Sequence, residues 1–312
     1  MEIFKKKHRF LPFLYTRLKA MKEGTLLTKR GTRYGYPSQN LLKNLGETLT
    51  EYNENLCAED MDDAWMDEFC VHLTQKTIRK NTVATYLKTL KSTLRSLCKT
   101  IKIFFPAEGF SYGWEVTTKV FTSVLEIEAM CKIDLSARPA LARTRDAYVV
   151  QCYTGLRFSD LIRLLQDPKQ ALVDDRFFRV RTQKTDKVVV IPIANKVRVI
   201  MEQRAWKFEK FSIQLYNRSL KVVAAEAGIT QMVELSYTSQ GKKVRELRAK
   251  NELMSSHTAR RSFATNAFLA GIPTLKIRQI TGHTTESSFL AYIRSDGMES
   301  AQTILNDPFF TN

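Results

Sequence analysis

Apolar residues recur every three or four positions through much of the first hundred residues. Four leucines between residues 41 and 49 share one helix face, and a longer apolar stripe runs through residues 83–97. Residues 10–18 show the same spacing. Residues 24–37 contain three glycines and a proline instead, which predicts a loop. We therefore expect residues 1–105 to fold as a helical domain.

The acidic segment AEDMDDAWMDEF, residues 58–69, lies inside this helical region. Its carboxylates could suggest a metal site. Carboxylates are also favoured in the first turn of a helix, where the partial positive charge of the N-terminus stabilises them. With Trp65 and Phe69 turned inward, we interpret the segment as the start of a helix and not as a metal site.

The second half of the chain begins with helical patterns. Residues 145–164 predict one buried helix, a break at Thr154 and Gly155, and a second helix. Residues 195–228 have the pattern of two amphipathic helices. This half is therefore expected to be largely helical as well.

Two segments of the second half predict β-hairpins. Residues 177–193 alternate and are rich in Phe and Val, which is typical of two strands, and a turn is expected near Thr185 and Asp186. Further along, Gly241 with the two lysines after it could turn a second small hairpin. These are the only strands that we expect.

Short helices with marked ends are predicted from Ser256 onward. Ser256 or Thr258 can cap the first of them, and Gly271 can end it in a left-handed conformation. Pro273 suits the opening turn of the next helix, and Gly282 can close that helix.

A domain boundary is predicted within residues 105–121. A proline and two glycines interrupt the helical pattern there, and the segment is mostly polar, so we interpret it as a linker. The expected domains are residues 1–112 and residues 119–312, a division that the chain length also favours. The expected fold class is mainly α with a small β component, that is, α+β.

Charge is strongly unbalanced along the chain. Lys and Arg number 49 against 32 Asp and Glu, so the formal net charge is +17 and the isoelectric point is about 9.7. This favours a polyanionic partner, and we prefer nucleic acid to a membrane surface because no basic amphipathic anchor stands out. On charge alone, the alternative is a ribosome-associated or merely basic protein.

The cysteines and the N-terminus bear on the compartment. The five cysteines are odd in number and form no CxxC pair, so we expect buried or free thiols in a reducing cytoplasm, not disulfides or zinc ligands. The opening MEIFKKKHRF is too short and too charged for a signal peptide or a membrane span. Both features predict an intracellular soluble protein without a membrane partner.

The last forty residues before the tail concentrate chemistry that suits attack on a phosphate. Arg260 and Arg261 are permanently charged, and a guanidinium grips two phosphate oxygens at once. His257 and His283 can donate hydrogen bonds to an oxygen whose charge grows in the transition state. The hydroxyl of Tyr292 can act as a covalent nucleophile. Each of these residues alone would be ascribed to packing or capping. The hypothesis of attack on a phosphate therefore depends on their combination.

The same residues resemble those of the tyrosine recombinase, or phage integrase, family. The resemblance lies in His257-Thr258-Ala259-Arg260, then Gly282-His283, then Tyr292 nine positions further on. The phrases SHTARRSFATN, ITGH and YI are particularly similar to integrases of Bacteroides-type mobile elements. RKNTVATYLKTLKSTL resembles the SAM-like, helical core-binding domain of the family.

TGLRFSDL, in the predicted break between two helices, is similar to the first arginine motif of the family. The resemblance makes Arg157 the first catalytic arginine and Asp160 a supporting carboxylate that orients neighbouring groups. Without the resemblance, these two side chains could simply form a surface ion pair. At a helix N-terminus, Arg157 would also be well placed beside an anion.

The family places a lysine in a β-hairpin, and QKT resembles its usual lysine-Thr-Gly phrase. We therefore expect Lys184 to protonate the leaving 5′ oxygen, with Lys187 as the alternative. Both lysines could instead guard an exposed strand edge. Asp186 stands where a glycine is frequent, so the turn departs from the family pattern.

A basic row lies beside the apolar stripe of residues 83–97, on a helix that Asn81 is expected to cap. Such a row is often only a solvated polar face. Given the site downstream, we prefer contact with a DNA backbone, which provides salt-sensitive affinity but little sequence choice. The row consists of Lys80, Lys88, Lys91, Arg95 and Lys99.

The resemblance implies a complete mechanism. Tyr292 attacks the scissile phosphate and forms a 3′-phosphotyrosyl link, while Lys184 protonates the departing 5′ oxygen. Arg157 and Arg260 bind the non-bridging oxygens, and the two histidines, His257 and His283, contribute hydrogen bonds or proton relay. A 5′ hydroxyl of a partner strand then reverses the step. No cofactor, metal or ATP is expected.

The implied partner is double-stranded DNA at specific recombination sites. The family also implies a homotetramer on DNA with a dimer at each site, accessory DNA-bending proteins, and a C-terminal tail for subunit contact, although the tail could dock on its own domain. The expected location is the cytoplasm of a bacterium, at the nucleoid when bound to DNA. Two other functions remain as alternatives: strand cleavage and rejoining like that of topoisomerase IB, and a non-catalytic DNA-binding accessory protein.

Overall fold

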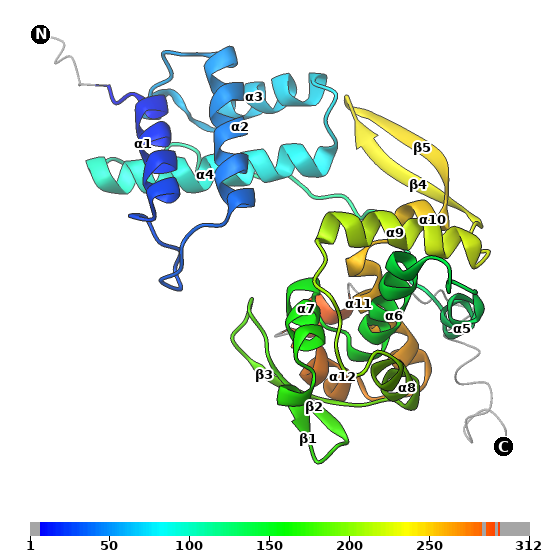
Figure 1. The fold of residues 1–312 in the computed structure, drawn as a ribbon. Coiled ribbons are helices and arrows are strands. Elements are labelled where there is room, and N and C mark those ends of the chain that lie inside the picture. Colours follow the sequence, from blue (N-terminus) through cyan, green and yellow to red (C-terminus); the bar gives the residue numbers. More distant parts are fainter. Residues whose placement is uncertain (1–6, 283–284, 291–292, 294–312) are drawn as a thin grey trace, which may run out of the picture. The chain divides into compact units, whose positions relative to one another are not determined.

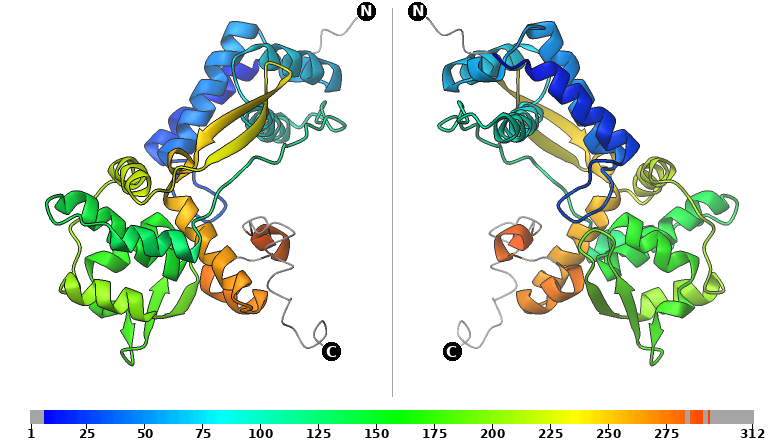
Figure 2. Two further views of the ribbon diagram at one scale, coloured as in Figure 1. Left: turned by 90° about the vertical axis from the view of Figure 1, so that its right-hand side faces the viewer. Right: turned by 90° about the vertical axis from the view of Figure 1, so that its left-hand side faces the viewer.

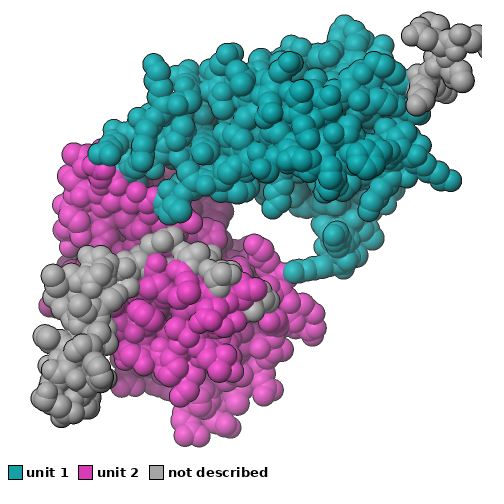
Figure 3. Space-filling model, turned by 180° about the vertical axis from the view of Figure 1, so that it is seen from behind, with its two compact units in different colours: residues 1–117, 235–246 teal, residues 118–234, 247–312 magenta. Residues whose placement is uncertain are grey.

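The computed structural model describes residues 7–282, 285–290 and 293 of the chain (Figure 1). These residues are mostly helical with two small antiparallel sheets, which confirms the expected α+β class. The chain groups into two compact units (Figure 3). Unit 1 comprises residues 1–117 and 235–246, and unit 2 comprises residues 118–234 and 247–312.

Unit 1 is built on helices that bury one apolar stripe each. Leu14, Leu45 and Leu90 are fully buried between three of them, as their helical spacing predicts. In the described residues these helices are α1 (Phe10–Glu23), α2 (Tyr36–Tyr52), α3 (Asp63–Gln75) and α4 (Lys80–Ile101), with a short 3-10 turn, η1 (Ala58–Asp60).

The acidic segment starts α3, which confirms that part of the prediction. Asp62 is the N-cap, and its carboxylate accepts a hydrogen bond from the backbone N–H of Trp65 at 2.9 Å. The ring of Trp65 stacks on that of Phe69, with centroids 5.1 Å apart, and Phe69 is fully buried. In the described part of the chain, no three His, Cys, Asp or Glu side chains lie close enough to hold a metal ion.

The start of α4 differs from the prediction. Arg79 is the N-cap, and Asn81 lies one residue inside the helix. The Asn81 amide exchanges hydrogen bonds of 3.0 Å with the backbone N–H and carbonyl of Glu115. A tertiary partner thus uses the side chain that local preference would have assigned to the cap.

Part of the expected linker packs into the core of unit 1. Phe105, Ala107 and Phe110 are buried against the helices. The backbone N–H of Phe110 also donates to Asp63 Oδ1 at 2.8 Å. These contacts order the segment that follows α4.

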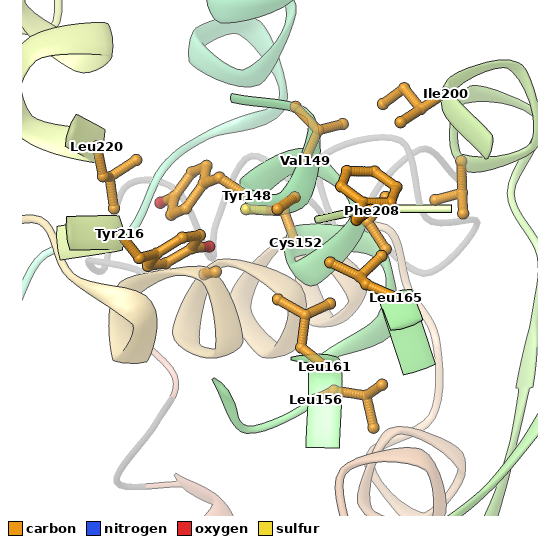
Figure 4. Packing of buried hydrophobic residues seen from close by; sticks show 14 of the residues in the cluster. Tyr148, Val149, Cys152, Leu156, Leu161, Leu165, Ile200, Phe208, Tyr216 and Leu220 are labelled. Atoms are coloured by element: carbon orange, nitrogen blue, oxygen red, sulfur yellow. The ribbon is translucent and has the colours of Figure 1, made fainter. Parts of the chain in front are cut away.

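Unit 2 surrounds one central helix, α6. Ala147, Tyr148, Val149 and Val150 are consecutive and fully buried, so this helix is covered on every side (Figure 4). The helices of this unit are α5 (Val124–Lys132), α6 (Pro139–Thr154), α7 (Phe158–Gln166), α8 (Asn195–Gln203), α9 (Ile213–Glu226), α10 (Lys250–Leu253), α11 (Ser256–Leu269), α12 (Thr274–Thr281) and α13 (Glu286–Leu290), with a 3-10 turn, η2 (Lys169–Ala171).

The sheet of unit 2 has the order β1-β2-β3 and is antiparallel throughout. Its strands are β1 (Leu172–Val173), β2 (Phe177–Arg181) and β3 (Val188–Pro192), so the predicted hairpin is confirmed. Phe178 lies opposite Ile191, and both are fully buried. α7 contacts β2 and α12 contacts β3, while α12 also packs on α11 (Figure 2).

The second predicted hairpin is also present, formed by β4 (Met232–Ser239) and β5 (Lys242–Ala249). Gln240 and Gly241 at its turn have positive φ angles of 50° and 71°, as two-residue hairpin turns require. Residues 235–246 belong to unit 1, where the Arg79 guanidinium lies 4.0 Å from the centroid of the Tyr237 ring.

Candidate active site

The turn between α6 and α7 places Arg157. Gly155 ends α6 in the left-handed conformation with φ 63°. A Cβ there would lie 2.5 Å from the ring of Phe263, so both the backbone and the available space require glycine. Arg157 is the N-cap of α7, as expected, and its Nη1 is buried without a hydrogen-bond partner among the described residues. A donor of this kind beside a helix N-terminus suits an anion.

Asp160 connects this helix to the β2–β3 hairpin. Its carboxylate is fully buried, and Oδ1 accepts hydrogen bonds from Arg163 Nη2 at 2.9 Å and from the backbone N–H of Gln183 at 2.8 Å. Its ion-pair partner is therefore Arg163, and not Arg157 as in the surface-pair alternative. Because Gln183 immediately precedes Lys184, Asp160 fixes the base of the turn that carries that lysine.

The turn of the β2–β3 hairpin is closed by side chains. Arg181 donates from Nε and Nη2 to the two carboxylate oxygens of Asp186, at 2.6 and 2.7 Å. The hydroxyls of Thr182 and Thr185 are 2.7 Å apart. Asp186 has a φ of 54°, so an aspartate occupies the position where the family often has glycine. Lys184 is exposed at this turn.

The N-terminus of α11 differs from the prediction by one residue. Ser255 is the N-cap, and neither Ser256 nor Thr258 takes that position. The Thr258 hydroxyl instead accepts from the backbone N–H of Ser255 at 3.0 Å. The helix therefore has His257 in its first turn and Arg260 one turn further.

Arg260 is buried, and its hydrogen bonds link two turns. Only 2% of this residue is exposed. Its Nη1 donates to the carbonyl of Gly155 at 2.6 Å, and its Nη2 donates to the carbonyl of Thr281. Thr281 is the last residue of α12, so one guanidinium joins the turn before Arg157 to the end of α12.

The environment of His257 shows which charges face it. Partial desolvation lowers the pKa of His257 from 6.5, and the positive charges of Arg261, Arg260, Lys184 and Arg157 lower it further. The imidazole nevertheless reaches solvent on one side. The charges of Lys184 and Arg157, which come from two other elements, therefore act on a histidine whose own helix carries Arg260 and Arg261.

Gly282 ends α12 in the left-handed conformation, with φ 68°, as predicted. A Cβ at this position would lie 3.9 Å from Thr185 Oγ1 and from Val189 Cγ1, so the end of α12 lies beside the β2–β3 hairpin. His283 and Tyr292 lie outside the described residues. Arg261, the other arginine of this stretch, donates from Nε to the carbonyl of Val120 at 2.9 Å.

A separate basic groove lies in unit 1, with a volume of about 690 Å³. It contains Lys88, Lys91, Arg95 and Lys99 of the predicted row, together with Arg17 and Lys29, which the sequence analysis missed. Lys29 belongs to the run Lys29-Arg30 in the first loop, a signal that could have been used.

Part of this row is engaged within unit 1. Arg95 pairs with Glu108 at 3.3 Å, and Lys91 donates to the carbonyl of Phe110. Lys80 lies outside the groove lining and approaches the ring of Tyr112, with Nζ 5.8 Å from the centroid.

On a mainly helical scaffold, the structure thus places a buried Arg157 donor at a helix N-terminus and a buried Arg260 that binds the turn before it. The chain belongs to the phage integrase family, which it matches over residues 121–298. It is a site-specific recombinase of the tyrosine type. None of the curated proteins matches the sequence.

Solved structures with the same fold are similar along nearly the whole chain. The Tn1549 transposon integrase in complex with circular intermediate DNA has a TM-score of 0.64 and 13% identity, covering 96% of this chain and 99% of that one. XerH site-specific recombinase bound to palindromic difH substrate has a TM-score of 0.65 and 14% identity, with coverage of 96% and 99%. A lambda integrase dimer bound to a COC′ core site has a TM-score of 0.64 and 14% identity, with coverage of 92% and 95%.

No helix among the described residues is long and apolar enough to cross a lipid bilayer.

Proposed function

We propose that Tyr292 is the nucleophile of this recombinase and that Arg157, Lys184, His257, Arg260 and His283 act with it on the scissile phosphate. Tyr292 forms a bond from its phenolic oxygen to phosphorus, and the bond from phosphorus to the 5′ oxygen breaks. The 3′-phosphotyrosyl link keeps the energy of the phosphodiester, so rejoining needs no ATP. In this proposal the arginines neutralise the charge that a metal ion neutralises in other phosphoryl-transfer sites.

One observation carries this proposal above the others. Arg260 of α11 binds the carbonyl of Gly155 in the turn before Arg157, and Asp160 of α7 binds the backbone N–H of Gln183 beside Lys184, so these hydrogen bonds join two helices and a hairpin turn. The charges of Arg157, Lys184 and Arg260 also act on the imidazole of His257. A phosphate placed there would meet permanently charged donors that need no reorganisation during the reaction. In this assignment Arg157 and Arg260 bind the non-bridging oxygens, and the histidines donate hydrogen bonds or relay protons.

The proposed DNA interface of unit 1 is the basic groove along α4. Lys88 and Lys99 line it, and we expect them to contact the phosphate backbone. We also propose double-stranded recombination sites as the substrate, a homotetramer with a dimer at each site, and accessory DNA-bending proteins. The SAM-like core-binding domain of residues 1–112 and the catalytic domain of residues 119–312, with its tail for subunit contact, belong to the same proposal.

The biological setting is proposed from the sequence motifs. SHTARRSFATN, ITGH and YI favour an integrase of a Bacteroides-type mobile element, acting in the cytoplasm on nucleoid DNA. The five cysteines are free thiols, which agrees with a reducing compartment. Integration, excision and inversion of DNA share the same chemistry.

The test uses a suicide DNA substrate, nicked beside the candidate site and taken from the ends of the element that encodes the protein. With EDTA present, the wild-type protein should form a covalent protein–DNA band on a denaturing gel. Two marked sites should then exchange flanking DNA. Relaxation of supercoils without exchange would indicate a topoisomerase-like enzyme, and tight salt-sensitive binding without a band would indicate an accessory protein.

The choice between the two hairpin lysines gives a prediction. Lys184→Ala should lower the single-turnover cleavage rate roughly a hundredfold, because loss of a general acid costs at least about this much. Lys187→Ala should leave the rate within about threefold if Lys184 is the general acid, since one acid suffices to protonate the leaving oxygen. A substrate whose leaving 5′ oxygen is replaced by sulfur should restore the cleavage rate of Lys184→Ala, because a thiolate can leave without being protonated. The opposite pattern would make Lys187 the acid.

The groove in unit 1 gives another prediction. Lys88→Ala and Lys99→Ala should each reduce the slope of log affinity against log salt by about 1, as expected for one lost phosphate contact. Lys43 on α2, which pairs with Glu47 at 3.4 Å and does not line the groove, provides the control variant Lys43→Ala. Fluorescence anisotropy across a salt series measures the slopes. Equal slopes for all variants would place the DNA elsewhere.

A further inference from the structure

The turn before Arg157 is held by a buried amide that the mechanism above does not use. Gln151 lies on α6 and has no exposed surface. Its side-chain Nε2 donates to the carbonyl of Leu156 at 2.9 Å. Its Oε1 accepts a hydrogen bond from the hydroxyl of Tyr216, on α9, at 2.7 Å. One side chain therefore spans from α9 to the turn between α6 and α7.

The carbonyl that Gln151 binds belongs to the peptide from which Arg157 extends. Fixing this peptide plane fixes the backbone position of Arg157, because the plane contains the Arg157 nitrogen. The adjacent carbonyl, that of Gly155, accepts from Arg260 Nη1 at 2.6 Å. Gln151 thus holds the peptide that contains the Arg157 nitrogen, and the peptide just before it in the chain is the one that binds Arg260.

Tyr216 decides which way the Gln151 amide faces. While its hydroxyl donates to Oε1, the NH2 group of the amide must face the Leu156 carbonyl. A flipped amide would bring one carbonyl oxygen against another. Burial first, and then the neighbouring Cys152, raises the pKa of Tyr216 well above 10, so the hydroxyl stays protonated as a donor at neutral pH. Figure 4 shows Tyr216 and Cys152 in the same core as Leu156.

Ending α6 does not require this amide. The backbone N–H of Gly155 already donates to the Gln151 carbonyl at 2.9 Å, which satisfies the helix end. Around the amide the core is apolar, with Leu156 and Leu161 almost completely buried. Burying the Gln151 amide and the Tyr216 hydroxyl in such a core costs free energy unless their hydrogen bonds are made, whereas an apolar side chain could pack there without that cost. The pair specifies one orientation of the turn.

We propose that Gln151, oriented by Tyr216, is a positioning residue that sets where Arg157 and Arg260 hold the scissile phosphate. The inference rests on the proposed function and adds to it a positioning residue that is not one of the proposed catalytic residues. Both residues are fully buried, so neither is placed to touch DNA. Each acts through the peptide planes of the turn.

The main experiment measures single-turnover cleavage of the nicked suicide substrate by the full-length protein. Gln151→Met keeps the shape of the side chain but removes both hydrogen bonds, and it should lower the cleavage rate roughly ten- to a hundredfold, as a misplaced supporting group does. DNA affinity should stay within about twofold, because most contacts to the backbone lie elsewhere. Tyr216→Phe, which keeps its ring, should lower the rate by a smaller factor.

A matched control separates positioning from loss of a core hydroxyl. Tyr148, on α6, is fully buried in the same core, and its hydroxyl lies 2.5 Å from that of Thr122, away from the turn. Tyr148→Phe is therefore the same chemical change and should cleave DNA at nearly the wild-type rate. Thermal melting of both variants shows whether their stability differs.

A second variant gives a signature that a purely structural role would not. A glutamate at 151 can donate to the Leu156 carbonyl only while it is protonated, and burial raises the pKa of a carboxyl group. Gln151→Glu should therefore approach the wild-type rate at acidic pH and lose activity as pH rises. The ratio of the Gln151→Met rate to the wild-type rate should not depend on pH.

The substrate supplies the last readout. A methylphosphonate at the scissile position lacks one charged oxygen, so it depends less on the arginines than a phosphate does. The defect of Gln151→Met should shrink on this substrate, while that of a destabilised protein would remain. Wild-type rates for Gln151→Met, an equal defect in Tyr148→Phe, or an unchanged defect on methylphosphonate would each overturn the inference. Failure of the wild-type protein itself to form the covalent band would overturn the proposed function, and this inference with it.

Discussion

Tyr292→Phe is expected to abolish the covalent protein–DNA complex. Phenylalanine keeps the ring but removes the only oxygen that could bond to phosphorus at this position, so no slower route through the same residue remains. Non-covalent DNA affinity should be unchanged, because the arginines and the basic groove remain. The measurement is the covalent band formed on the nicked substrate, with EDTA present throughout.

Tyr153→Phe is the matched control for that experiment. Tyr153 is a partly buried tyrosine of α6 whose ring packs against the core of unit 2, so loss of its hydroxyl should leave the band intact. A covalent band that persists in Tyr292→Phe would show that another side chain is the nucleophile. A band that requires a divalent cation would contradict the metal-free mechanism.

Local patterns predicted most elements because each was encoded by nearby residues. Gly155 and Gly282 end helices with positive φ angles, and both were recognised as breaks from sequence. The alternating Val and Phe residues of β2 and β3 predicted their hairpin. Asn81 misled the prediction because its amide binds the backbone of Glu115, a partner 34 positions away that no local rule can supply.

The candidate site could be predicted as a set of residues, though not as a structure. The motifs around Arg157, Lys184 and Arg260 are short and specific, and a family resemblance identifies them. The sequence did not indicate that Asp160 holds the hairpin through the backbone of Gln183. Nor did it indicate Gln151, since a glutamine inside an apolar helix has no signal until its carbonyl partner at Leu156 is known. Such contacts depend on how separate elements pack.

Arg260→Ala is expected to lower the cleavage rate by about 10³, the upper part of the range for one lost oxyanion donor. The loss should be that large because Arg260 has two functions. In the proposed function it supplies a charged donor to the phosphate, and in the structure it holds the carbonyls of Gly155 and Thr281. Without it, these buried carbonyls lose their partners, which costs about 1–3 kcal/mol each, so the free energy of unfolding should fall as well.

Arg260→Lys separates charge from geometry. A lysine keeps the positive charge, but its single ammonium group cannot span two carbonyls as a planar fork does, so its rate should remain close to that of Arg260→Ala. Arg261→Lys is the matched control, because Arg261 bonds to the Val120 carbonyl and the Thr258 hydroxyl instead. Single-turnover cleavage and thermal melting test all three variants. If Arg260→Lys cleaved DNA at the wild-type rate, positive charge alone would suffice. The hydrogen bonds of Arg260 to the two turns would then have no part in catalysis.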